Sequence, residues 1–118
     1  MIKIREGSSA RWEMFGQIDP GLGQLFYKFV EALKMNGAEE VIITSIIRPK
    51  ENDSGVHEAG RGIDMASIYP KDVTEKICNY INQMYPYDIS RPNMKSIIHH
   101  KTNVYNDNNW HFHLQVRA

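Results

Sequence analysis

The chain has 118 residues, of which 42% are hydrophobic and 24% charged, proportions typical of a globular domain. They exclude intrinsic disorder, a collagen-like chain and a coiled coil. Fourteen basic and fourteen acidic residues give a formal net charge of +0. This balance argues against a nucleic-acid-binding domain, because such domains neutralise phosphates with surplus Lys and Arg.

Organisation and cellular context follow from what the sequence contains. A single cysteine, Cys78, excludes an internal disulfide, and no repeat or linker divides residues 1–118, so we expect one domain. No run approaches the roughly eighteen apolar residues that cross a bilayer. The first residues lack the apolar region of a signal peptide, so we expect synthesis in the cytoplasm, no membrane partner and a monomer.

The first half of the chain predicts two strands and a helix. Residues 2–5 are expected to form a short strand, followed by a loop over 6–19 that its aromatic residues hold in place. Asp19-Pro20 predicts a helix start, since Asp is a good N-cap and Pro suits the first helical position, and Gly37 predicts its end. A β-branched run over 40–47 predicts a buried strand. The residues expected on the inner stripe of the helix are Leu22, Leu25, Phe26, Phe29, Val30 and Leu33.

The second half predicts a helix among short strands. A strand is expected at 62–66, and a helix from Pro70 or Asp72 to about Met84. Three further strands are expected at 96–99, 104–105 and 110–116. The residues expected on the inner face of this helix are Val73, Ile77, Ile81 and Met84. The predicted fold is α+β: a small, largely antiparallel sheet with two main helices packed on it.

The last predicted strand alternates strictly between apolar and polar residues. Period two sends His111, His113 and Gln115 to one face and the apolar residues to the other, which is core. Two imidazoles on one face can share a metal ion, or one can bind the metal while the other assists the chemistry; an ordinary surface strand fits equally well. His99 and His100, expected at a strand edge or in a loop, point to opposite faces, so at most one of them can join this face. The residues expected on the core face are Trp110, Phe112, Leu114 and Val116.

A second polar motif runs from His57 to Asp64. Gly60 and Gly62 lie between the two side chains and allow the backbone to turn so that they converge. Asp64 is the anomaly, because it lies in an apolar strand and a buried carboxylate is costly unless it is paired or bound to a metal. Two histidines and a carboxylate form a known catalytic zinc set with an open position for water.

Together these segments resemble the zinc peptidase superfamily of D-alanyl-D-alanine peptidases, phage L-alanyl-D-glutamate endolysins and the Hedgehog amino-terminal domain. That family carries a Ser-x-His-x-x-Gly-x-Ala-x-Asp segment and a late His or His-x-His strand, which His57, Gly60, Asp64 and His113 match here, with Gly62 in place of the usual alanine. The resemblance implies a Hedgehog/D-Ala-D-Ala peptidase-like fold. It also implies one Zn²⁺ held by His57, Asp64 and His113, with His111 as the other candidate for the last ligand.

The resemblance also assigns the remaining site residues. Arg48 resembles the family arginine that steadies the substrate carbonyl, and Ser54 lies one residue upstream of the usual substrate-binding serine. The main departure is the general base: Trp110 occupies the position, three residues before the last histidine, where the peptidases often carry glutamate. Asp107 and His111 are the two candidate replacements.

The implied function is zinc-dependent hydrolysis of amide bonds in bacterial peptidoglycan stem peptides, as a D,D- or L,D-type carboxypeptidase or endopeptidase. Such a protein would act at the bacterial cell wall, after release from the cell or as part of a phage particle. The alternative is a catalytically silent zinc-binding module that binds a partner or serves as a structural component of a virion, and the missing glutamate favours it. A metal-dependent nuclease is disfavoured by the neutral charge.

Overall fold

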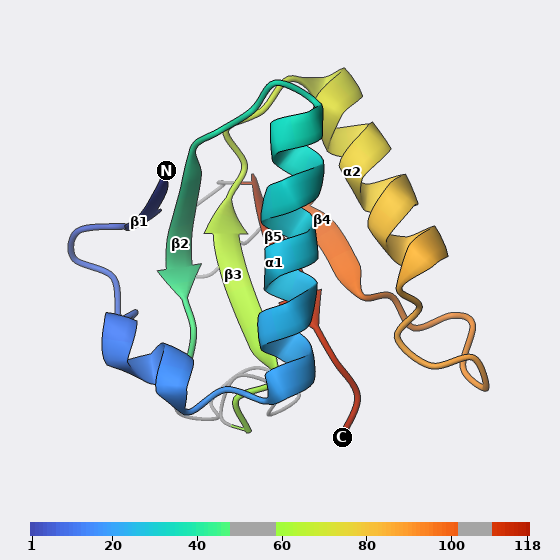
Figure 1. Ribbon diagram of the computed structural model, residues 1–118, viewed down its shortest axis with the longest axis horizontal. Helices are drawn as coiled ribbons and strands as arrows, with labels where there is room; N and C mark the ends of the chain where they lie inside the picture. Colours follow the sequence, from blue (N-terminus) through green and yellow to red (C-terminus); the bar gives the residue numbers. More distant parts are fainter. Residues whose placement is uncertain (48–58, 102–109) are drawn as a thin grey trace.

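The computed structural model describes residues 1–47, 59–101 and 110–118 (Figure 1). The sequence predicted most of the element bounds within these ranges to within two residues. The elements are β1 Ile2–Ile4, a 3₁₀ helix Trp12–Gly16, α1 Pro20–Met35, β2 Val41–Ser45, β3 Gly62–Ala66, α2 Lys71–Met84, β4 Ile97–Lys101 and β5 Trp110–Gln115. The strand expected at 104–105 lies outside the described residues.

The strands form one sheet in the order β1-β2-β3-β5-β4. β1 runs parallel to β2, and the other neighbouring strands are antiparallel. Both helices lie over the same face of this sheet, α1 against β3 and β5 and α2 against β4 (Figure 1). The predicted α+β architecture with two helices on a largely antiparallel sheet is therefore confirmed. Within the described part of the chain, neither helix is long and apolar enough to span a membrane.

Local signals set the two ends of α1. The Asp19 carboxylate accepts a hydrogen bond from the Gly21 amide at 2.8 Å, which caps the N-terminus as predicted. Gly37 ends the helix with a φ of +79°, a conformation that side-chain-bearing residues rarely adopt. The residues buried along the inner stripe are Leu22, Leu25, Phe26, Phe29, Ala32 and Leu33.

The core lies between the helices and one face of the sheet. Phe112 of β5 is fully buried and packs its ring 5.7 Å from the ring of Phe29 in α1. Ile63 and Met65 of β3 are also fully buried. Because side chains alternate along a strand, the residues between these core positions face the side of the sheet that the helices do not cover. That alternation places Asp64 and the polar residues of β5 together on the second face.

Asn82 fixes the beginning of β4 against α2. Its side-chain oxygen accepts hydrogen bonds from the backbone amides of Ser96 and Ile97, at 3.0 and 3.1 Å. Its side-chain nitrogen donates to the carbonyl of Ile97 at 3.1 Å. These bonds tie α2 to the strand that carries His100.

Two expectations about the core are wrong. Met84 is 55% exposed, because it is the last residue of α2, and Thr74 is buried instead. Trp110, expected in the core, is 47% exposed: at the beginning of β5 its ring stacks on His99, with centroids 4.8 Å apart. The spacing of apolar residues identified which face of each helix or strand points to the core. It did not show how far the layer packed against that face extends, and both exposed residues lie at the end of an element.

Cys78 should react slowly with thiol reagents while the protein is folded. Burial raises the pKa of its thiol from the ordinary value of 9.0 to about 11, and Lys95 opposes the shift only in part. At pH 8 the reactive thiolate should therefore be about 100-fold scarcer than in the unfolded chain, and labelling slower by a similar factor. Labelling rates with and without denaturant test this, and equal rates would contradict it.

Candidate functional site

The candidate site lies on the sheet face opposite the helices, where β3 and β5 pair. Asp64 is directly opposite His113 in the register of these antiparallel strands, and Ala66 is opposite His111. On the far side of β5, His113 is opposite Ile98 of β4. Residues paired across antiparallel strands share a face, so β3, β5 and β4 bring their polar side chains together.

Asp64 and His113 form a buried contact between residues 49 positions apart in the chain. The imidazole Nδ1 lies 2.7 Å from carboxylate oxygen Oδ1, and the two side chains are 14% and 9% exposed. A carboxylate this buried would be unstable without compensating charge or hydrogen bonds. The structure therefore brings together two of the three predicted metal ligands.

The other predicted site residues lie outside the described ranges. They are Arg48, Ser54, His57 and Asp107. Within 1–47, 59–101 and 110–118, no three His, Cys, Asp or Glu side chains converge closely enough to hold one metal ion. The third ligand and the substrate-binding residues therefore remain predictions.

His100 joins this face of the sheet, a position that sequence reasoning left between edge and loop. It lies opposite His111 in the β4–β5 register, and the two ring centroids are 4.2 Å apart. Partial burial lowers the pKa of His100, the neighbouring His113 lowers it further, and Asp64 opposes both effects. The protonation of His100 therefore depends on the charges of Asp64 and His113. Adjacent histidines in a strand were predicted to face opposite ways, and the register bears this out.

His99 points to the opposite face, toward the helices. Its ring stacks on that of Trp110 and lies tilted against that of Phe112, with both centroid distances 4.8 Å. Its Nε2 lies 2.8 Å from the hydroxyl of Ser67. His99 is thus a structural residue, and only one member of the His99-His100 pair lies on the face of the candidate site.

Two further polar residues adjoin the pair and were not predicted as site residues. Ser45, at the end of β2, is opposite Asp64 beyond a register shift; it is 5% exposed, and its hydroxyl has no hydrogen-bond partner in the part of the chain that the structure describes. Gln115 is 6% exposed and bonds to His113. A buried unpaired hydroxyl beside a buried carboxylate is typical of a site with an additional polar occupant. The sequence signal that could have identified Ser45 is its place as a polar residue at the end of the apolar strand β2.

The residues present fit a zinc ion chemically. Imidazole nitrogen and carboxylate oxygen are both ordinary Zn²⁺ ligands. A hard Ca²⁺ or Mg²⁺ site would instead use oxygen ligands alone, so His113 favours a transition metal.

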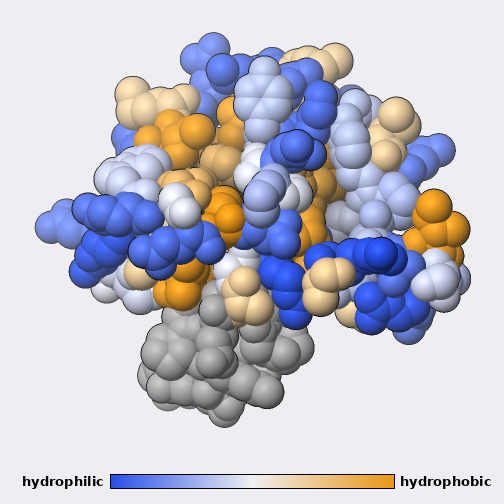
Figure 2. Space-filling view, turned by 60° about the horizontal axis from the view of Figure 1, so that its bottom comes forward, coloured by the Kyte–Doolittle hydropathy of each residue, from blue (hydrophilic) through white to orange (hydrophobic). Residues whose placement is uncertain are grey.

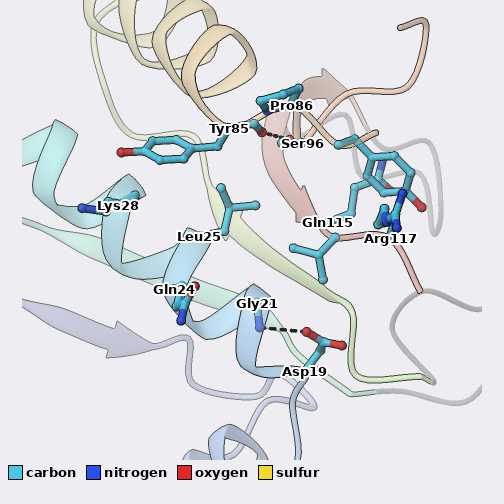
Figure 3. Close-up of a pocket in the computed structure, with 12 residues that line it drawn as sticks. Asp19, Gly21, Gln24, Leu25, Lys28, Tyr85, Pro86, Ser96, Gln115 and Arg117 are labelled. Carbon is cyan, nitrogen blue, oxygen red and sulfur yellow. Dashed lines mark hydrogen bonds between the residues drawn. The ribbon is translucent and has the colours of Figure 1, made fainter. Parts of the chain in front are cut away.

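A separate cavity of about 440 Å³ lies between α1, the segment that follows α2, and the C-terminal residues (Figure 3). Leu25, Tyr85 and Arg117 are among its lining residues, whereas Asp64 and His113 are not. Gln115 also lines it, and so connects this cavity with His113. Figure 2 brings the lower end of the molecule in Figure 1 forward, and hydrophilic and hydrophobic residues are intermixed on that surface. This cavity is therefore adjacent to the candidate site but separate from the Asp64–His113 contact.

No protein-family model, curated protein or solved structure matched the chain. The assignment of function consequently depends on the residues of the site.

The titration of His99 should make the fold less stable in mild acid. Burial, and then the neighbouring His100, lowers the pKa of His99 below its ordinary value of 6.5. The unfolded chain therefore binds more protons, so the contribution of neutral His99 is complete above about pH 6.5 and is lost as the pH falls through the folded pKa. In metal-free protein, His99→Phe should flatten the decline of unfolding free energy between pH 7.5 and 5. Lys101→Gln is the matched control on the same strand, and an unchanged slope in His99→Phe would contradict the expectation.

Proposed function

We propose that the chain is a zinc-dependent peptidase that hydrolyses amide bonds in peptidoglycan stem peptides. The observation that carries the proposal is the contact between Asp64 and His113, which joins the two separate motifs of the sequence at 2.7 Å. An ordinary surface strand with two chance histidines would not account for a buried carboxylate paired with one of them. The fold supports the proposal too, since a two-helix α+β domain is the architecture that the resemblance implies.

In this proposal Asp64 and His113 hold one Zn²⁺ together with His57. When bound, the ion would lower the pKa of a coordinated water toward about 7 and polarise the scissile carbonyl. Arg48 would donate hydrogen bonds to the carbonyl oxygen as negative charge develops there. Ser54 would contact the substrate.

The general base is Asp107 or His111, which takes a proton from the attacking water and then protonates the leaving amine. The position of His111 supports this role, because it shares the sheet face of His113 and lies two residues away along β5. Its ring also lies against that of His100, with the two centroids 4.2 Å apart. Asp107 lies outside the described residues.

The substrate class comes from the resemblance to cell-wall peptidases and phage endolysins. The protein would be a monomer acting at the bacterial cell wall, after release or as part of a phage particle, and would cleave as a D,D- or L,D-type carboxypeptidase or endopeptidase. One observation favours the second candidate, a catalytically silent zinc-binding module. Trp110, at the position of the usual glutamate, stacks its indole on His99 and has no group that can accept a proton from water.

Zinc content tests the ligand assignment directly. His57→Ala, Asp64→Ala and His113→Ala should each reduce bound zinc from about one ion per chain to a small fraction, because each removes one of three protein ligands. Metal analysis after dialysis measures this. His99→Phe, which changes a histidine on the other face, is the matched control and should retain its zinc. Normal zinc content in all three ligand variants would refute the assignment.

Turnover separates the two candidate functions. With one equivalent of zinc the protein should release new amino groups from purified peptidoglycan, and Arg48→Ala should slow this by about 100-fold or more while zinc stays bound. Loss of zinc in Arg48→Ala would instead assign Arg48 to the fold. No amino-group release, with unchanged zinc affinity in Asp107→Ala, would favour the silent module.

A further inference from the structure

Gln115 connects His113 to the protein backbone. It is the last residue of β5, is 6% exposed and shares a strand face with His113. Its side-chain nitrogen Nε2 donates a hydrogen bond to the carbonyl oxygen of Lys95 at 2.8 Å. Its side-chain oxygen Oε1 lies 3.2 Å from Nε2 of the His113 ring.

Donor and acceptor chemistry fixes the orientation of this amide. The carbonyl of Lys95 can only accept a hydrogen bond, so it must face the NH₂ group of Gln115. The amide oxygen, which also only accepts, must then face the ring of His113. That contact is a hydrogen bond only if Nε2 of His113 carries the hydrogen.

The tautomer of His113 determines which of its atoms faces Asp64. In a neutral imidazole with hydrogen on Nε2, the lone pair is on Nδ1, and Nδ1 is the atom 2.7 Å from the Asp64 carboxylate. Two acceptors at this distance repel each other unless a proton or a metal cation compensates. A cation bound by both atoms removes the repulsion and uses both lone pairs.

We propose that Gln115 is a positioning residue that holds His113 in the Nε2–H tautomer, so that a divalent transition metal binds through Nδ1 of His113 and the carboxylate of Asp64. The inference rests on the proposed zinc site and adds the residue that prepares it. A ligating histidine generally donates its other ring N–H to an acceptor, which orients the ring and raises its basicity. Gln115 provides that acceptor from the same strand, and the Lys95 carbonyl keeps it in place.

Two variants separate the acceptor from the size of the side chain. Gln115→Met keeps the length of the side chain but removes both hydrogen bonds. Gln115→Glu keeps an acceptor toward His113 but replaces the donor to Lys95 with an oxygen, which must turn away from that carbonyl. A purely structural role would make both variants behave alike, whereas a positioning role predicts that only Gln115→Met is impaired.

The first measurement is the ¹⁵N spectrum of the histidine rings in metal-free protein. Nε2 of His113 should carry a hydrogen in the wild type and in Gln115→Glu. In Gln115→Met, where Nε2 loses its acceptor, the hydrogen should lie on Nδ1, which faces the Asp64 carboxylate. An unchanged Nε2–H form in Gln115→Met would overturn the proposal. Should Gln115→Met fail to fold, Gln115→Asn, whose amide cannot reach Nε2 from the same backbone position, takes its place with the same expected result.

The second measurement is zinc affinity by competition with a chelator. Gln115→Met should bind zinc about 10- to 100-fold more weakly than the wild type, the usual effect of losing such a partner, and Gln115→Glu should stay within a few-fold. Equal affinity in Gln115→Met would overturn the role in metal binding. Failure of the wild type to bind zinc would refute the proposed function instead, and the metal-free spectrum would still decide whether Gln115 sets the tautomer.

Discussion

The contact between Asp64 and His113 is the interaction on which the arrangement of this sheet face depends. The carboxylate lies in the middle of β3, flanked by the fully buried Ile63 and Met65, and it keeps its charge at little cost only if an opposing group compensates it. β5 supplies that group because its register places His113 directly opposite. The same pairing sets Phe112 into the core, so the packing of the helix layer and the polarity of the other face share one register. Neither layer can be rearranged without disturbing the other.

Sequence reasoning succeeded for the fold wherever the signal was local. The Asp19 cap and Gly37 bounded α1 correctly, since capping and a positive φ depend on a few neighbouring residues. The strand expected at 62–66 has those bounds in the structure. Exposure at the ends of elements was not predictable: periodicity gives the face of Met84 and Trp110, but their burial depends on the reach of a layer distant in the chain. Trp110 also found a partner in His99, and no local pattern encodes that pairing.

Sequence reasoning about the site succeeded in a different way. Asp64 could be singled out because a carboxylate in an apolar strand requires an explanation, and a late histidine could be proposed as its partner through the resemblance. The direct pairing with His113 could not be derived, because strand register between β3 and β5 is non-local. His100 was missed as a neighbour of the pair for the same reason, since it is an ordinary polar residue until the sheet brings β4 beside β5. The alternation of β5 placed Gln115 on the face of His113, but its hydrogen bond to the Lys95 carbonyl was not predictable, because Lys95 is distant in the chain.

The strict alternation of β5 also restricts how this protein can change. A shift of the β5 register by one residue, through a deletion or an insertion, would turn His113 inward toward the helices and carry Phe112 and Leu114 outward to the face of Asp64. Such a shift would disrupt the hydrophobic core and the Asp64–His113 contact together. Length variation is therefore tolerable only outside this strand, whereas substitutions that keep its two-residue rhythm leave the polar face open to new side chains. Laboratory evolution of a different activity on this scaffold should diversify positions of that face and hold the spacing of the strand constant.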